Sequence, residues 1–269
     1  MKINIKSVQY HVDVVGAGDP IVLLHGFTGD GTTWSETVRH ISHHHKVILI
    51  DIIGHGKSDA PTNLERYDIQ CAAEDLAEIL NNLNIKKADF LGYSMGGRLA
   101  LTFAILFPTR VNRLILESST PGIKSEMERS ERRQKDSALA RRILDEGMVA
   151  FVDYWEDIPL FSSQKRLPEE VQKNIRMQRL GNSPIGLSNS LLGMGTGSQP
   201  SWWERLNAIE LPVLITAGGL DRKFCLIGKD MQDHLKNAQY KEIPHCGHAI
   251  HVEDPQKFGT IIEEFLNNT

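Results

Sequence analysis

Short apolar segments of strand length recur along the chain, and helical patterns lie between several of them. The segments are residues 21–24, 47–51, 88–91, 114–116 and 213–217. Residues 68–83 carry apolar side chains at helical spacing, from Ile69 through Leu76 to Leu83, which places one apolar stripe on a helix. Strands that alternate with helices are typical of a mostly parallel sheet flanked by helices. The pattern therefore predicts an α/β fold.

This alternation stops after Glu117 and gives way to a long charged stretch with helical character. Ser125 followed by Glu128 fits a capping box that opens the first helix of that stretch. Residues 193–198 are rich in glycine, and we expect a flexible return to the core there. The predicted division is an α/β core of residues 1–120 and 201–269 and an inserted helical cap of residues 121–200.

Composition and charge narrow the functional class. The chain has 269 residues, 41% of them hydrophobic, which is enough for the core of one large domain. Its 30 Lys and Arg against 34 Asp and Glu, with no long basic stretch, argue against a nucleic-acid partner. No signal peptide or membrane-spanning segment is evident, and Cys71, Cys225 and Cys246 are an odd, widely spaced set that predicts free thiols. We expect a cytoplasmic protein with no membrane contact.

The segment Gly-Tyr-Ser-Met-Gly at residues 92–96 lies between an apolar run and a helix-like run. A tight turn from strand to helix needs glycine on both sides of the serine, because larger side chains would collide with neighbouring backbone. Ser94 is the predicted nucleophile of this elbow. The alternative is a solvent-facing serine in an ordinary loop.

A serine hydroxyl needs a histidine to accept its proton and a carboxylate to orient that histidine. Asp221 follows the predicted strand at 213–217, and His248 lies in the loop before the C-terminal helix predicted at 255–266. The order Ser, Asp, His is typical of hydrolases built on parallel sheets. The candidate triad is Ser94, Asp221 and His248.

Other residues compete for these roles. Glu117 ends another strand and is the alternative to Asp221, since triads are recognised by geometry rather than by position. His245 and His251 flank His248 in the same loop. The run of three histidines at 43–45 is expected to be a solvated turn, and no metal site is predicted.

Residues 25–29, His-Gly-Phe-Thr-Gly, follow an apolar strand and form a candidate oxyanion-hole loop. The amides of Phe27 and Met95 would converge on a developing negative charge, with about 3 to 4 kcal/mol typical for one donor. The alternative is a simple glycine turn. Residues 51–58 are expected to hold the shape of a nearby loop and to have no catalytic role.

With these segments in this order, the chain resembles the α/β-hydrolase superfamily over nearly its whole length. Within it, residues 25–29, 92–98 and 247–248 resemble the 2-succinyl-6-hydroxy-2,4-cyclohexadiene-1-carboxylate synthase family of menaquinone biosynthesis. The resemblance implies a lyase that eliminates pyruvate from 2-succinyl-5-enolpyruvyl-6-hydroxy-3-cyclohexene-1-carboxylate, with no cofactor and no acyl-enzyme. It assigns the removal of a ring proton to Ser94, although the residues would also permit His248 to take it directly.

Arg98 makes a substrate with several carboxylates physically reasonable. It follows Ser94 by one helical turn and faces the same direction. A guanidinium binds carboxylates in bidentate fashion, so Arg98 is expected to hold the substrate. The alternative is an arginine that pairs with a nearby acid.

The resemblance also implies four further substrate-binding residues, which are Arg133 and Arg179 in the cap, Tyr93 beside the nucleophile, and Trp155. Arg132 or Arg176 could take either arginine role, and a charged helix is often only a solvated face. Tyr93 and Trp155 could equally be packing residues. The expected partner is a small polycarboxylate.

Two other functions stay open on the sequence alone. Ser94 could act as a covalent nucleophile that hydrolyses an ester or carbon–carbon bond of a small acidic metabolite. A protein that kept the fold only for binding is the third possibility, and the complete set of triad residues argues against it.

Overall fold

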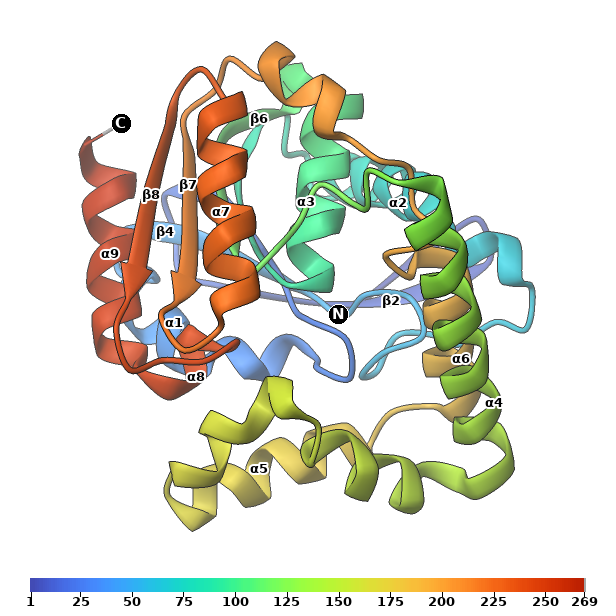
Figure 1. The fold of residues 1–269 in the computed structure, drawn as a ribbon. Helices are drawn as coiled ribbons and strands as arrows, with labels where there is room; N and C mark the ends of the chain where they lie inside the picture. The colour runs from blue at the N-terminus through green and yellow to red at the C-terminus, as the bar shows by residue number, and fades with distance from the viewer. Residues whose placement is uncertain (269) are drawn as a thin grey trace.

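A single eight-stranded sheet forms the centre of the molecule in the computed structural model, which describes residues 1–268 (Figure 1). The strands lie in the order β1-β2-β4-β3-β5-β6-β7-β8, and all neighbours from β4 to β8 are parallel. Only the pairs β1-β2 and β2-β4 are antiparallel, so the predicted mostly parallel sheet is confirmed. The strands are β1 (Lys2–Ile5), β2 (Val8–Val15), β3 (Asp19–Leu24), β4 (His45–Ile50), β5 (Ala88–Tyr93), β6 (Val111–Glu117), β7 (Val213–Gly218) and β8 (Ala238–Ile243).

Helices cover both faces of this sheet, which explains why its central strands are continuous apolar runs. Every residue of β5 and of β7 is buried. Helices α1 (Ser35–Ile41) and α9 (Pro255–Asn268) pack together on one face. Helices α2 (Ile69–Asn82), α3 (Met95–Leu106) and α7 (Arg222–His234) lie on the other face (Figure 1). The apolar stripe predicted for residues 68–83 is the buried face of α2.

Between β6 and β7 the chain forms a set of helices that we call the cap, residues 121–200. It contains α4 (Glu126–Glu156), the 3₁₀ helix η4 (Pro159–Arg166), α5 (Glu169–Leu180) and α6 (Pro184–Met194). Helices α4 and α6 lie side by side, and α5 crosses below the ends to which the arrows of β7 and β8 point (Figure 1). The cap has its own small apolar cluster around Ile143, Phe151 and Leu187. The carboxyl ends of the strands therefore face helices rather than open solvent.

Two local features of the cap follow from its sequence. Ser125 Oγ accepts a hydrogen bond from the Glu128 amide at 3.4 Å, so the serine half of the predicted capping box is confirmed. Gly147 interrupts α4 with φ 80° and ψ 173°, a conformation that is essentially restricted to glycine. The long helix is therefore kinked at Gly147.

The glycine-rich segment 193–198 differs from its prediction as a flexible return. Met194, Gly195 and Gly197 are buried, and a Cβ at Gly197 would lie 2.6 Å from the Arg129 carbonyl oxygen. Ser198 also donates a hydrogen bond to the Leu192 carbonyl oxygen at 2.7 Å. Glycine serves close packing against α4 here, rather than mobility.

Candidate active site

Ser94 lies at the turn between β5 and α3, in a backbone conformation with φ 51° and ψ −106°. Such a positive φ is costly for a residue with a side chain and persists only where the surroundings enforce it. Two glycines make the turn possible, since a Cβ at Gly96 would lie 2.1 Å from the Leu24 carbonyl oxygen and one at Gly92 would lie 2.4 Å from that of Gly96. The Ser94 amide donates to the Glu117 carbonyl oxygen at 2.8 Å. The elbow is therefore held by backbone contacts on several sides.

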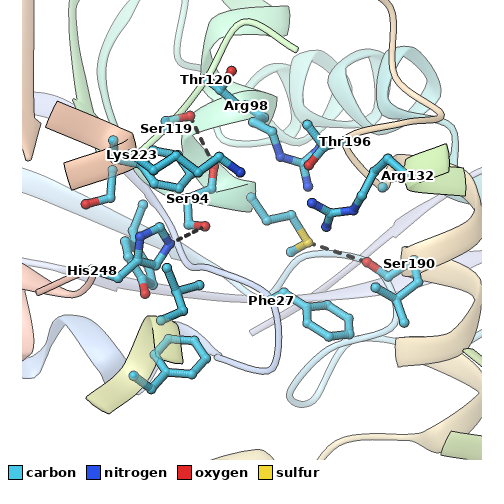
Figure 2. Close-up of a pocket in the computed structure, with 18 of the residues that line it drawn as sticks. Phe27, Ser94, Arg98, Ser119, Thr120, Arg132, Ser190, Thr196, Lys223 and His248 are labelled. Atoms are coloured by element: carbon cyan, nitrogen blue, oxygen red, sulfur yellow. Dashed lines mark hydrogen bonds between the residues drawn. The ribbon is translucent and has the colours of Figure 1, made fainter. Parts of the chain in front are cut away.

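The structure brings Ser94, His248 and Asp221 into one hydrogen-bonded chain (Figure 2 shows the Ser94–His248 bond). His248 Nε2 lies 3.0 Å from Ser94 Oγ, and His248 Nδ1 lies 2.6 Å from Asp221 Oδ2. Because a carboxylate only accepts, Nδ1 donates to Asp221, and Nε2 is free to accept the serine proton. This is the geometry of a nucleophile, a base and an orienting acid.

The competing residues form a separate pair. Glu117 accepts hydrogen bonds from the amide and from Nδ1 of His251, at 3.1 and 2.9 Å, and does not touch His248. His245 is exposed, with φ 69°. The geometry therefore favours Asp221 over Glu117, and His248 over both of its neighbours.

The loop after β3 faces the same cavity as Ser94. Its shape depends on buried His25, whose Nε2 accepts a hydrogen bond from the Ile52 amide at 3.0 Å. Burial lowers the pKa of His25, so the ring is held in its neutral form. The Phe27 amide donates no hydrogen bond within residues 1–268, and Met95 is the first residue of α3, whose N–H has no acceptor within the helix. Both amides are therefore available as donors beside Ser94.

The segment at residues 51–58 supports this loop, as expected. Asp51 accepts hydrogen bonds from the amides of Gly31 at 2.7 Å and of Lys57 at 2.8 Å. Ser58 Oγ donates back to the Asp51 carbonyl oxygen at 2.6 Å. None of these four residues lines the cavity at Ser94.

A cavity of about 160 Å³, partly open to solvent, lies at Ser94 between the core and the cap (Figure 2). Phe27, Trp155 and Phe161 line its apolar part. Its charged lining residues within the described part of the chain, apart from the titratable His248, are all cationic: Arg98, Arg132 and Lys223. No carboxylate lines this cavity among residues 1–268. The chamber therefore suits an anionic molecule with an apolar frame.

Arg98 is buried, and its Nη1 donates to the Met194 carbonyl oxygen and to Gln199 Oε1. Both partners are neutral, and no carboxylate forms a hydrogen bond with Arg98 within residues 1–268. Burial lowers the pKa of Arg98 to about 9, since the charged form is desolvated. The partners fix the guanidinium in place without neutralising it, in contrast to the paired arginine considered from the sequence.

Arg132 and Lys223 complete the cationic lining (Figure 2). Arg132 Nε donates to Asp136 Oδ1 at 2.8 Å, and burial raises the pKa of that carboxyl group. Lys223 Nζ makes no hydrogen bond or ion pair within residues 1–268, and burial lowers its pKa. The sequence analysis did not identify Lys223, although its place two residues after Asp221 on the same sheet edge was a usable signal.

The other candidate arginines do not line this cavity. Arg133 donates to the Gly197 carbonyl oxygen at 3.0 Å and to Glu126 at 2.7 Å. Arg179 is buried, donates to Gln164 at 3.0 Å and lies 4.7 Å from the ring centroid of Phe161. It lines a smaller neighbouring cavity that shares Tyr93 and Phe161 with the first.

Arg176 forms ion pairs with Asp153 and Glu156 on the cap surface. Its guanidinium is thereby neutralised by two carboxylates. Of the arginines weighed for the cap, only Arg132 reaches the cavity at Ser94 within the described residues.

Tyr93 and Trp155 both line the cavity. The Tyr93 ring lies 5.4 Å from the ring of His248, and burial raises the pKa of its hydroxyl well above the usual value. Trp155 packs edge-on against Phe27 with ring centroids 5.5 Å apart. Its indole N–H is buried and has no acceptor within residues 1–268, so a donor remains unused in the cavity wall.

Within residues 1–268, no cluster of three or more His, Cys, Asp or Glu side chains could hold a metal ion. His45, unlike the solvated turn expected for the histidine run, is buried at the start of β4. Cys71, Cys225 and Cys246 are free thiols, as predicted. No helix in this part of the chain is both long and apolar enough to cross a membrane.

Comparison with known proteins gives a consistent set of relatives. A family model of the alpha/beta hydrolase fold matches residues 19–255. A Bacillus subtilis (strain 168) protein, provisionally assigned as 2-succinyl-6-hydroxy-2,4-cyclohexadiene-1-carboxylate synthase, is 48% identical over 97% of this chain and 96% of its own length. The synthase of that name from Photorhabdus laumondii is 30% identical over 92% of this chain and 85% of its own. The solved structure of MenH from S. aureus aligns with a TM-score of 0.91 and 40% identity, covering 96% of this chain and 97% of that one.

Proposed function

The chain belongs to the α/β-hydrolase family and, within it, to the 2-succinyl-6-hydroxy-2,4-cyclohexadiene-1-carboxylate synthases, and on this premise we propose that it is the lyase that forms this compound in menaquinone biosynthesis. The substrate is 2-succinyl-5-enolpyruvyl-6-hydroxy-3-cyclohexene-1-carboxylate, and the second product is pyruvate. The single observation that best supports the proposal is the cationic cavity at Ser94, which has no acidic lining residue within the described chain. The substrate has three carboxylates, on the ring, the succinyl group and the enolpyruvyl group.

The change from a 3-ene to a 2,4-diene defines the bonds that change. The ring loses the proton on carbon 2, which is acidified by the adjacent succinyl ketone. The electrons of that C–H bond form the new double bond to carbon 3, the old double bond moves to carbons 4 and 5, and the bond from carbon 5 to the enolpyruvyl oxygen breaks. The released enolate of pyruvate takes a proton on its methylene carbon.

The triad supplies the proton transfers in this proposal. Ser94 gives its hydroxyl proton to His248 Nε2 while its oxygen takes the proton from ring carbon 2, and Asp221 stabilises the imidazolium that forms. The imidazolium then protonates the departing enolate, so the triad returns to its starting state. The 3.0 Å distance from Nε2 to Ser94 Oγ is compatible with this exchange.

Loss of the proton on carbon 2 places negative charge on the succinyl ketone oxygen. We assign its stabilisation to the amides of Phe27 and Met95, which line the same cavity as Ser94. The helix dipole of α3 has its positive end at Met95 and favours the same charge. An acyl-enzyme is not needed at any step.

We assign the three carboxylates to the three cations of the cavity. Arg98 and Arg132 offer guanidinium groups for bidentate binding, and Lys223 offers an ammonium that makes no hydrogen bond or ion pair within residues 1–268. We propose that Arg133, which bonds the Gly197 carbonyl oxygen, supports the loop that carries the Arg98 partners instead of touching substrate.

Tyr93, Trp155 and Arg179 complete the proposed site. Tyr93 shapes the floor beside His248, and the free indole N–H of Trp155 donates to a substrate oxygen. Arg179 contacts substrate only after the Phe161 ring moves aside. Residues 121–200 act in this proposal as the substrate-binding cap on a core of residues 1–120 and 201–269, and the reaction takes place in the cytoplasm.

The test is pyruvate release from substrate made in situ by the preceding pathway enzyme. Three samples are compared: the intact protein, the Ser94→Ala variant, and a protein-free control for spontaneous elimination. We expect the intact protein to accelerate release well above both others. Equal rates in all three, together with a fast burst of product from an activated ester, would replace the lyase with a serine hydrolase of a small acidic metabolite.

A further inference from the structure

A second buried acid–histidine pair lies directly behind the proposed triad, and the mechanism above does not use it. Glu117 and His251 have side chains that are 0% exposed, and His251 Nδ1 lies 2.9 Å from each carboxylate oxygen of Glu117. His251 Nε2 forms a further hydrogen bond of 2.9 Å with Thr33 Oγ1. Desolvating two ionisable groups is costly, so a buried pair of this kind calls for an explanation beyond stability.

Glu117 contacts the Ser94 elbow and the loop that carries His248 through different atoms. Its carbonyl oxygen accepts the Ser94 amide at 2.8 Å, which ties it to the strained elbow. Its carboxylate accepts the His251 amide at 3.1 Å, which ties it to the loop that carries His248 three residues earlier. Glu117, at the end of β6, therefore links the elbow of Ser94 with the loop that carries His248.

His251 extends the connection to the third loop of the site. Its bond to Thr33 reaches the segment that follows the proposed oxyanion loop. Its ring also lies 4.4 Å from the ring of Trp34 and 4.7 Å from that of Tyr93, the residue before Ser94. The elbow, the histidine loop and the oxyanion-loop side thus meet at one imidazole.

We propose that Glu117 and His251 are positioning residues that hold Ser94 and His248 at their reactive distance. The inference goes beyond the choice of substrate and rests on the proposed catalytic use of the triad, whatever reaction it performs. Proton transfer depends steeply on geometry, and a displacement of about 1 Å can cost on the order of 100-fold in rate. The hydrogen bonds of Glu117 to the amides of Ser94 and His251 limit that displacement.

The first test is Glu117→Gln, which keeps the size of the side chain and removes its charge. We expect kcat for pyruvate release to fall on the order of 100-fold with KM little changed, because the substrate contacts lie elsewhere. The matched control is Asp89→Asn. Asp89 is also 0% exposed and pairs with Arg113 at 2.8 Å, but it lies near the opposite end of the strand that delivers Ser94. The Asp89→Asn substitution should lower the free energy of unfolding to a similar degree and leave kcat unchanged.

A second readout does not depend on the reaction. The His248 Nδ1 proton in its 2.6 Å bond to Asp221 should give a low-field proton NMR resonance. We expect this resonance to broaden or disappear in Glu117→Gln through faster exchange, and to persist in Asp89→Asn. This readout tests the positioning role of Glu117 and His251 even if no protein sample releases pyruvate.

Substitutions at His251 cover the case in which Glu117→Gln does not fold. His251→Asn keeps a donor toward Glu117 and should retain most of the activity, whereas His251→Phe fills the space against Trp34 without a donor and should behave like Glu117→Gln. If Glu117→Gln and His251→Phe lose stability while kcat and the low-field resonance match those of Asp89→Asn, the pair is only structural and the proposal is wrong.

Discussion

The buried ion pairs in the core differ from the exposed ion pairs on the surface of the cap. In the core, Asp75 and Asp89 have side chains that are 0% exposed and pair with arginines at 2.7 and 2.8 Å. In the cap, ion pairs such as Arg176–Asp153 and Lys165–Asp157 are largely exposed. Exposed pairs contribute only about 0 to 1 kcal/mol and adapt easily, whereas buried charges tolerate little displacement.

The difference matches the two tasks in the proposed reaction. The core supplies Ser94, His248 and Asp221, whose geometry has to be exact to a fraction of an ångström before the substrate arrives. The cap supplies Arg132 and Trp155, which line the cavity at Ser94 and are proposed to bind the substrate. Apart from Arg98 and Lys223, which are core residues proposed to bind substrate, we therefore expect core substitutions to act on kcat and on global stability, and cap substitutions to act on KM and on local stability.

The largest effect is expected from Asp221→Asn. Loss of the carboxylate removes the hydrogen bond that orients His248 and the charge that stabilises its imidazolium, and this typically lowers kcat by about 10⁴-fold with the fold intact. Pyruvate release measures kcat, and circular dichroism checks the fold. The control is Asp230→Asn, an exposed acid on the same helix α7. An unchanged kcat in Asp221→Asn would remove this residue from the triad.

Sequence reasoning recovered the central parallel strands because they depend on local signals, and it selected Ser94, Asp221 and His248, which the structure joins by hydrogen bonds. A run such as residues 88–91 is apolar whichever way the chain folds, and the glycines around Ser94 are required by sterics within the turn itself. Strand β2 was missed because its mixed sequence, Val-Gln-Tyr-His-Val-Asp-Val-Val, carries an alternating, half-buried pattern rather than a continuous apolar run.

The substrate contacts were less predictable because they depend on which face of a helix meets a distant segment. Arg132 and Arg133 are adjacent, yet a rotation of about 100° per residue sends one into the cavity and the other toward Gly197. Lys223 reaches the same cavity from the core, and its place two residues after Asp221 is the signal that separates it from an ordinary surface lysine. Which side chains reach the cavity therefore depends on the three-dimensional structure and not on local sequence alone.

The next effect concerns acid sensitivity of the core. Burial lowers the pKa of His55 from 6.5 to about 3, so the unfolded chain takes up a proton in that pH range and the native state does not. Stability is therefore lost as the pH falls from 6.5 toward 3, by roughly 1.4 kcal/mol per pH unit for this group. His25, 5.2 Å away between ring centroids, adds a loss in the same direction.

Urea unfolding at pH 7 and pH 4.5 measures this loss. The free energy of unfolding should fall between pH 7 and pH 4.5 in both proteins. We expect this fall to be roughly 2 to 3 kcal/mol smaller in His55→Asn than in the unsubstituted protein. His43→Asn, at an exposed histidine, should show the unsubstituted pH dependence. Identical pH dependence in all three proteins would show that His55 does not titrate as its burial implies.

A matched pair of adjacent arginines tests the cap. Arg132→Met should raise KM about 10- to 100-fold, because a charge-assisted hydrogen bond to a carboxylate contributes about 1.5 to 3 kcal/mol. Arg133→Met should change KM little, since Arg133 contacts Glu126 and Gly197 rather than the cavity. Steady-state kinetics give the KM of each variant and show which of the two arginines binds the substrate. If Arg133→Met raised KM more than Arg132→Met did, the carboxylate contact would be assigned to Arg133.

The smallest effect is expected at the kink of α4. Gly147 has φ 80° and ψ 173°, and a Cβ there would meet no atom within 4 Å, so Gly147→Ala is opposed by backbone strain alone, about 1 to 3 kcal/mol before relaxation. The cap can relax by reshaping its exposed helix, so we expect the free energy of unfolding to fall by only about 1 kcal/mol, with faster amide exchange confined to α4. Gly181→Ala is the control, because Gly181 has φ −73° and 3.5 Å of clearance, and alanine there should be neutral or slightly stabilising. If Gly147→Ala instead accelerated exchange in β5 and lowered kcat, the cap and the core would be one mechanical unit, and the contrast between them would not hold.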